Sequence, residues 1–339
     1  MKSRSRWFIM FMAVFTAAAL AAGIATVAKA ADFPNRPITI VVPVSAGGGY
    51  DLGARTIARF LPKHLPNKVD VVVDNMPGAG QMIGVHSVYA AKPDGYTLVA
   101  FNAIGALMAQ FIRPESVKFD MNKFNYLGLW QQDVRGIGLS NGMTEKTWDE
   151  LVKRSAKKPI LTGTGGIGTG QHIDPLILEA VSDLKLKYIH YDGNAQVDPA
   201  IGRGEIELQM GQVSVLTRME KQKIGWGFCV VDANRYPLAP KIPTCLEVGM
   251  PKNIYEKLME LPFFGVDRAI AVPPGTDPAI VEILRKALWD TFKDPEYLAQ
   301  VKVIKGENNP MQGKDYQNLV VKRIQAAKEN QALIEKLKF

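Results

Sequence analysis

Cysteine and histidine are scarce in this chain of 339 residues, which has two cysteines and four histidines. The histidines do not pair at helical spacing, and neither Cys229 nor Cys245 has a cysteine or histidine nearby. Because metal sites need several such ligands at short spacing, we expect no metal and no cofactor. Two buried thiols are the favoured interpretation of the cysteines, although an exported protein could join them in a disulfide.

Long apolar runs, basic stripes and catalytic motifs are also missing after residue 30. No later stretch is long enough to span a membrane. No basic stripe is interleaved with aromatic residues, so nucleic acid is not an expected partner. Ser45 and Ser214 lack the G-x-S-x-G context, and no pair of a nucleophile and a base emerges. We therefore expect that the protein is not an enzyme.

The first thirty residues have the pattern of an export signal. Lys2, Arg4 and Arg6 precede an apolar run that ends at Ala28-Lys29-Ala30, which predicts a signal peptide of residues 1–30, cleaved after Ala30. An uncleaved membrane anchor is the alternative. Four of the basic residues belong to this segment, so the formal charge falls from +8 to +4 on its removal. Net charge is therefore a weak argument for an anionic ligand.

The remaining chain repeats one plan. A β-branched run at residues 37–43 leads into a glycine-rich loop and then a helical pattern, in which Ala54, Ile57, Ala58 and Leu61 share one face. Residues 159–211 repeat the order strand, glycine-rich loop, helix, strand, turn, helix, strand. Strands that alternate with helices predict parallel sheets.

These repeats predict an α/β protein of two lobes. Each lobe is expected to be a mainly parallel sheet flanked by helices, with a ligand cleft between the lobes. The apolar stretches at residues 127–140 and 224–231 are the candidate crossovers. We therefore assign residues 31–133 and 228–339 to the first lobe and residues 134–227 to the second.

The two glycine-rich loops are the candidate binding elements. Each follows a predicted strand and opens a helix, whose first N–H groups have no partner within the helix and carry positive potential. Glycines let a ligand approach the main chain, so each loop predicts an anion site. Hydroxyl groups of Ser45, Thr164 and Thr169 would add donors.

The second loop allows other interpretations. Residues 163–168 spell G-x-G-x-x-G, and Asp192 follows at an offset that suits a dinucleotide ribose. Export would separate the chain from cytosolic cofactors, and the first loop lacks this fingerprint, so a dinucleotide is disfavoured. Both loops could also be tight turns without a ligand.

Four nearby side chains have open roles. Asp51 would either contact the ligand or serve as a first-turn helix acid. His172 would act as a base or, as we favour, shape the loop by a hydrogen bond. Asn102 and Tyr191 end predicted strands and would contact the ligand or cap their elements.

The ordered motifs resemble one family. The segments FPNRPITIVVPVSAGGGYD, VVVDNMPGAGQMIG, KPDGYTLVAFN, LTGTGGIGTGQH, YDGNAQVDPAIGRGEIEL, YPLAPKIPTCLEVG and VPPGTDPAIVEILRKAL occur in this order and cover nearly all of the mature chain. Together they resemble the periplasmic receptors of tripartite tricarboxylate transporters, the Bug-type or TctC-like solute-binding proteins.

The resemblance implies a two-lobed periplasmic-binding fold (type II-like) that closes on a small carboxylate and docks on inner-membrane permease subunits. We expect a periplasmic monomer. The ligand-binding residues that it implies lie in the first loop, the second loop and the strand ends. They are Ser45, Ala46, Gly47, Gly48, Gly49 and Asp51; Thr164, Gly165, Gly166, Gly168, Thr169, Gly170 and His172; and Asn102, Tyr191 and Asp192.

The chain departs from the family pattern in three places. Val44 stands where the family usually has an aromatic residue after the proline of the first strand. Gly211-Gln212 replaces the usual Asp-Asn pair, which removes a partner for a ligand ammonium and disfavours amino acids as ligands. Residues 261–268 differ from the usual tryptophan-containing stretch; a surface position is favoured for Arg268, although a position near the cleft is the alternative. A mono- or dicarboxylate receptor is the leading hypothesis, and a ligand sensor or an exported enzyme are the others.

Overall fold

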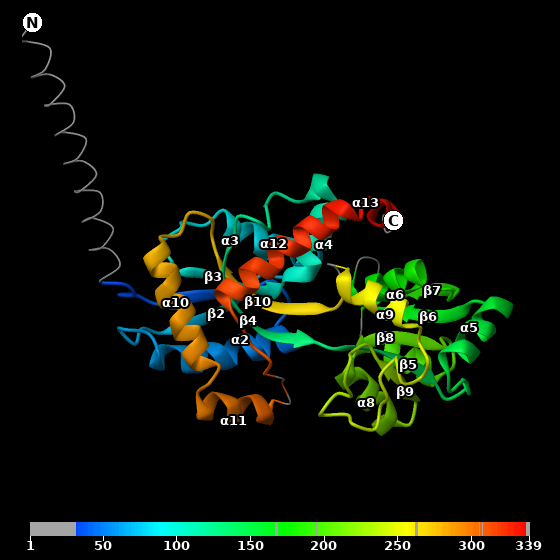
Figure 1. Ribbon diagram of the computed structural model, residues 1–339. Helices are drawn as coiled ribbons and strands as arrows, with labels where there is room; N and C mark the ends of the chain where they lie inside the picture. Colours follow the sequence, from blue (N-terminus) through cyan, green and yellow to red (C-terminus); the bar gives the residue numbers. More distant parts are fainter. Residues whose placement is uncertain are drawn as a thin grey trace, which may run out of the picture.

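The computed structural model describes residues 32–336, apart from residues 167–168, 194–195, 262–263, 305 and 307. The expected signal peptide, residues 1–30, lies outside the described residues. In the part that is described, none of the helices combines the length and the apolar character that crossing a membrane would need. The described chain forms two α/β lobes, each built on its own sheet (Figure 1).

The first lobe is built on a sheet of six strands in the order β11-β4-β10-β3-β1-β2. These are β1 (Ile38–Val42), β2 (Val71–Asn75), β3 (Thr97–Asn102), β4 (Asn125–Asp133), β10 (Val266–Val272) and β11 (Met311–Gln312). β1 runs parallel to β2 and β3. β10 runs antiparallel to β3 and β4, and β11 antiparallel to β4.

The second lobe is built on a sheet of five strands in the order β7-β6-β8-β5-β9. These are β5 (Arg135–Ser140), β6 (Ile160–Thr164), β7 (Leu186–His190), β8 (Leu208–Gln212) and β9 (Gly225–Val230). β6 is parallel to β7 and β8, whereas β5 is antiparallel to β8 and β9. The two-lobed α/β prediction is confirmed, but the prediction of mainly parallel sheets is wrong. Both sheets are mixed, because β4, β5 and β10, which connect the lobes, are not part of strand–helix–strand units.

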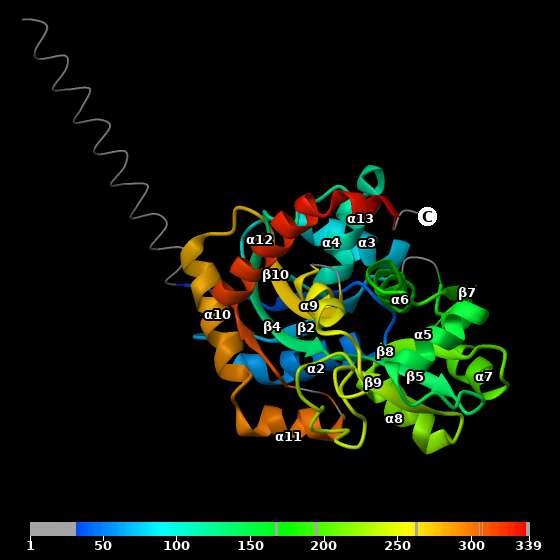
Figure 2. The same cartoon turned by 45° about the vertical axis from the view of Figure 1, so that its right-hand side comes forward.

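Helices cover both sheets (Figures 1 and 2). The first lobe has α2 (Gly49–Phe60), α3 (Met82–Tyr89), α4 (Ala103–Ile112), α10 (Pro278–Thr291), α11 (Pro295–Val303), α12 (Gly313–Glu329) and α13 (Gln331–Lys336), and the short 3₁₀ turns η1 (Leu61–Lys63), η2 (Ala79–Gln81) and η3 (Pro114–Ser116). The second lobe has α5 (Trp148–Lys157), α6 (Gly170–Val181), α7 (Val197–Gly202), α8 (Val213–Gln222) and α9 (Lys252–Glu260).

Helix α2 follows the expected apolar pattern. Ala54, Ile57 and Ala58 are buried in the core of the first lobe, and so is Leu61 just after the helix. Their burial fixes the rotation of α2 against the sheet and places its N-terminus directly after the first glycine-rich loop.

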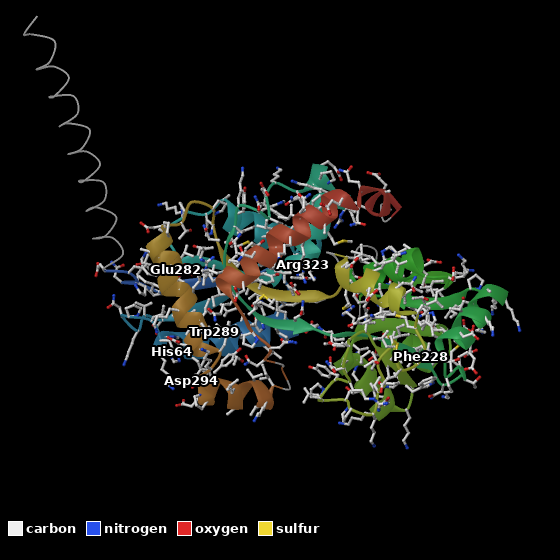
Figure 3. All side chains as sticks on the ribbon, viewed as in Figure 1. His64, Phe228, Glu282, Trp289, Asp294 and Arg323 are labelled. Carbon is white, nitrogen blue, oxygen red and sulfur yellow. A yellow bond between two sulfur atoms is a disulfide. The ribbon has the colours of Figure 1, made fainter. Side chains whose placement is uncertain are left out.

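The lobes join where β4 runs into β5, with only Val134 between the two strands. The expected first crossover is at this point. The sequence analysis placed the return of the chain to the first lobe at residue 228. This residue falls inside β9, which pairs with β5 in the second sheet, and Phe228 lies in the second lobe (Figure 3). Helix α9 packs against α6 of that lobe. We propose that the return crossing lies at Gly265, just before β10.

Cys229 and Cys245 form a disulfide, with 16 residues of separation along the chain. The favoured interpretation of two free buried thiols is therefore wrong. The sequence pattern showed the apolar strand around Cys229 but not that the chain after β9 turns back, so that Val230 bridges to Thr244 beside it. This turn brings the second cysteine to the first.

Asp294 connects two helical segments of the first lobe. It caps α11 by accepting the N–H of Glu296, and it lies 3.0 Å from both Lys63 Nζ and His64 Nε2. His64 and Asp294 lie close together in Figure 3. Burial favours the neutral acid, but these donors together lower the pKa of Asp294 to about 2.

Candidate functional site

A cavity of about 510 Å³ lies between elements of the two lobes. Its size is in the range of small-molecule sites. Its lining residues are Val44, Tyr50, Ala79, Gly80, Gln81, Asn102, Ile104, Gly105, Met108 and Arg113 from the first lobe, Thr169, Gly170, Ile173 and Asp174 from the second, and Gly265 before β10. Of the expected site residues, Asn102, Thr169 and Gly170 line this cavity.

The first glycine-rich loop is exposed and ends in helix α2. Residues 45–49 are all exposed, and Gly48 is the extended N-cap residue of the helix. Asp51 is buried and does not line the cavity. Its carboxylate accepts the N–H of Gly47 at 2.9 Å and the Nε–H of Arg55 at 2.9 Å. Burial opposes ionisation, but these hydrogen bonds lower the pKa of Asp51, so an ionised acid holds the loop.

Arg268 lies against the start of α2. A Cβ atom on Gly49 would come within 2.8 Å of a guanidinium nitrogen of Arg268. Arg268 is only 7% exposed, so its expected surface position is wrong. The reason is the β10 register, which pairs Arg268 with Asn102 and Gln131 inside the sheet. The guanidinium therefore adds positive charge to the helix N-terminus.

Tyr50 packs beside Arg268 and lines the cavity. The Arg268 guanidinium carbon lies 4.6 Å from the centre of the Tyr50 ring. The Tyr50 hydroxyl is buried and has no hydrogen-bond partner among the described residues. Burial raises its pKa, so the hydroxyl keeps its proton and can donate a hydrogen bond.

The second glycine-rich loop is held by threonine hydroxyl groups. Thr169 donates its hydroxyl to the Gly166 carbonyl at 2.8 Å, and Gly166 has a φ of +115°, which favours glycine. Thr164 is buried, and its hydroxyl lies 2.7 Å from His190 Nδ1. Gly165 is half-buried, and Gly168 lies outside the described residues.

His172 lies in the first turn of α6, after this loop. It is buried, and its ring packs edge-on against those of Tyr188 and His190, with ring centres 5.5 and 4.7 Å apart. Burial and the neighbouring His190 lower the pKa of His172 to about 4. The imidazole is therefore neutral at physiological pH and supplies no charge to the site.

Arg135 stands beside the second helix N-terminus, as Arg268 stands beside the first. One of its guanidinium nitrogens lies 3.8 Å from the position of a Cβ atom on Gly170. Arg135 and Asp174 form an ion pair in which both side chains are at least 95% buried. The Arg135 Nε–H has no hydrogen-bond partner among the described residues. The sequence pattern did not identify Arg135 or Asp174.

Asp133 accepts hydrogen bonds from several side chains where the lobes join. It accepts from Gln131 at 2.5 Å and from Arg268 at 3.2 Å, and also from Gln212 at the end of β8. Gln131, Gln212, Arg268 and Gly49 also line a second, smaller cavity of about 160 Å³. This network joins the first sheet to the second through Gln212, the residue that departs from the family pattern.

The strand-end residues have separate positions. Asn102 caps α4 by accepting the N–H of Gly105 at 3.1 Å, and the Gln81 side chain makes two hydrogen bonds to its backbone. Tyr191 donates to Glu205 at 3.3 Å, and Asp192 is exposed. Neither Tyr191 nor Asp192 is among the lining residues of the cavity. In the described ranges, no cluster of three or more His, Cys, Asp or Glu side chains could hold a metal ion.

Comparisons with known proteins identify the family of this chain. Residues 54–339 match the model of the tripartite tricarboxylate transporter family receptor. A relative from Agrobacterium vitis, a UPF0065 protein in the TAR-I ttuE-ttuC' intergenic region, is 30% identical over 273 residues, which are 79% of this chain and 75% of the relative.

Solved structures share the fold. A TctC solute-binding protein from Polaromonas has a TM-score of 0.73 at 24% identity, covering 90% of this chain and 99% of the other. A Rhodopseudomonas palustris protein solved with adipate has a TM-score of 0.72 at 19% identity, covering 90% and 98%. The chain belongs to the tripartite tricarboxylate transporter receptor family of periplasmic solute-binding proteins.

Proposed function

We propose that this protein captures a small organic carboxylate between its lobes and delivers it to a tripartite tricarboxylate-type permease. The observation that carries the proposal is the pairing of each helix N-terminus with a buried arginine, Arg268 at Gly49 and Arg135 at Gly170. Main-chain N–H groups and guanidinium groups are both strong donors to carboxylates.

The ligand that these groups suit is an acid without an ammonium group. Asp174, the only acid among the described residues that line the cavity of about 510 Å³, is paired with Arg135. Asp133 likewise accepts hydrogen bonds from Arg268, Gln131 and Gln212. Among the described lining residues, no acid is thus left to neutralise a ligand ammonium, which supports a carboxylic acid over an amino acid.

The expected loop residues take supporting roles in this proposal. The N–H groups of Gly49 and Gly170, at the starts of α2 and α6, would face the ligand. Asp51, Thr164 and His172 would hold the loops in place from behind, because each is buried. Tyr50 would donate its hydroxyl to the ligand.

The family supports the proposed localisation and partners. The signal pattern of residues 1–30 supports export and cleavage after Ala30. A receptor in the periplasm needs an inner-membrane partner, and the family supports permease subunits in that role. The structural relative solved with adipate supports a carboxylate as the cargo. Binding and release, without catalysis, is the activity that we propose.

A thermal-shift screen of mono- and dicarboxylates tests the proposal. A ligand present at 100 times its Kd should raise the free energy of unfolding by about 2.7 kcal/mol, which raises Tm measurably. The matching neutral amides should give no shift, because they lack the charge. If no acid shifts Tm at millimolar concentration, the proposal fails.

A further inference from the structure

Arg113 lines the cavity between the lobes but belongs to neither glycine-rich loop. It follows helix α4 directly and is half-buried. A guanidinium nitrogen lies 3.9 Å from the position of a Cβ atom on Gly80, so the charged end reaches the turn η2, which also lines the cavity.

The Arg113 backbone is fixed on both sides. Its N–H donates to the Ala109 carbonyl at 2.9 Å, which closes the last turn of α4. Its carbonyl accepts the N–H of Ser116 at 3.0 Å and the Ser116 hydroxyl at 2.9 Å. Because Pro114 follows, the chain cannot continue the helix here. The side chain therefore starts from a defined position beside the cavity.

The charge of Arg113 is not neutralised within the part of the chain that the structure describes. Its guanidinium makes no ion pair and no side-chain hydrogen bond there. The charged residues that line the cavity are Arg113 and Asp174, and Asp174 is paired with Arg135. One positive charge thus remains at this cavity, in addition to the partial positive charge of the two helix N-termini.

We propose that Arg113 binds a second carboxylate, which makes the ligand a dicarboxylate. This inference rests on the proposed function, in which the first carboxylate is held at Gly49 and Gly170. Ile104, Met108 and Ile173 line the same cavity and offer an apolar surface to the methylene chain between the two acids. Arg113 is in this view a specificity-determining residue, since it distinguishes a diacid from a monoacid of equal length.

The test compares adipate with its half-amide, which has the same length but one charge fewer, on the wild type and on Arg113→Gln. Calorimetric titration of the wild type should give a preference of about 10- to 100-fold for the diacid, as expected for one charge-assisted contact. Arg113→Gln should abolish the preference and leave the half-amide affinity unchanged.

Arg36→Gln is the matched control. Arg36 is exposed, pairs with Asp94 and is not among the residues that line the cavity. Its replacement by glutamine therefore removes the same formal charge as Arg113→Gln without changing a residue at the cavity. It should keep the full preference for the diacid. Apo Tm values of all three proteins should agree, which excludes misfolding.

The outcomes distinguish failure of the inference about Arg113 from failure of the proposed function. If the wild type binds both acids equally, or if the diacid preference survives in Arg113→Gln, the inference is wrong while the proposed function stands. If Arg113→Gln weakens both ligands equally, Arg113 does not read the second carboxylate and the inference is also wrong. If the wild type binds neither acid, nor any other acid of the thermal-shift screen, the proposed function itself fails.

Discussion

The two glycine-rich loops precede equivalent helices in the two lobes, yet different chemistry holds them. In the first lobe, the ionised carboxylate of Asp51 binds the loop at Gly47. In the second lobe, Thr169 and the neutral imidazole of His172 lie behind the loop. The two loops therefore share a helix N-terminus with an arginine beside it, but the side chains that hold each loop in place are different.

The arginines differ as well. Asp133, the partner of Arg268, accepts from two glutamine side chains in addition. Among the described residues, Asp174, the partner of Arg135, has only the N–H of Gly265 at 3.4 Å as a further donor. Burial raises the pKa of Asp174, against the effect of Arg135. The second ion pair is therefore the more sensitive to loss of its arginine.

Replacement of the arginines should show the largest effect. Arg135→Met leaves a buried, nearly unpartnered carboxylate and should lower the free energy of unfolding by about 3–5 kcal/mol. Arg268→Met should cost about 2 kcal/mol, because Asp133 keeps its amide donors. Urea denaturation measures both. Adding Asp174→Leu to Arg135→Met should recover most of the lost free energy of unfolding. If Arg135→Met and Arg268→Met lower the free energy of unfolding equally, the two ion pairs do not differ in the way described.

The second lobe alone has a disulfide. Replacing Cys229 and Cys245 with alanine removes a cross-link over 16 residues and should cost about 3 kcal/mol of unfolding free energy. Carboxylate affinity should not change, since neither cysteine lines the cavity. Denaturation measures the loss of stability, and calorimetric titration measures the carboxylate affinity. A large loss of affinity would mean that the disulfide also supports the binding site.

The two loops should respond to different ranges of pH. His172 has a pKa of about 4 in the folded protein, below its ordinary value of 6.5, so the unfolded state binds more protons between these values. Stability should therefore fall by on the order of 2 kcal/mol as pH drops from 7 to 4. His172→Gln should flatten this slope. The pKa of Asp51 is lowered below its ordinary value of 3.8, so its contribution to stability is present at neutral pH and is lost only in stronger acid. Asp51→Asn should therefore lower stability at neutral pH, leave the slope between pH 7 and 4 intact, and differ less from the wild type as pH falls further.

Alanine at the two helix starts should give the smallest effects. At Gly49 a methyl group would lie 2.8 Å from Arg268, whereas at Gly170 its nearest neighbours lie at 3.8 Å. Gly49→Ala should weaken carboxylate binding about 10-fold by displacing the guanidinium, and Gly170→Ala less than about 2-fold. Calorimetric titration decides this, and the reverse order would mean that the second loop is the more tightly packed.

Much of the fold could be predicted from the sequence because its signals are local. The apolar spacing of Ala54, Ile57 and Ala58 predicted the buried face of α2, and the repeated strand–loop–helix order predicted two α/β lobes. The antiparallel strands were missed, because nothing local in residues 125–140 tells which neighbours β4 and β5 pair with.

The site could be predicted only in part, for the same reason. Each glycine-rich loop can be recognised within a single segment of the sequence. The second loop led to Thr169 and Gly170, which line the cavity. Arg135, Arg113 and Arg268 come from distant segments, and their positions depend on the sheet register and on the turn after α4. A single sequence gives no signal for such convergence, which is also why the disulfide was missed.

A crystal structure of the complex with a bound dicarboxylate tests the central claim most directly. We expect one carboxylate within about 3 Å of main-chain N–H groups at the starts of both α2 and α6, beside Arg268 and Arg135. A carboxylate bound elsewhere, with both helix N-termini free of ligand contacts, would contradict the account.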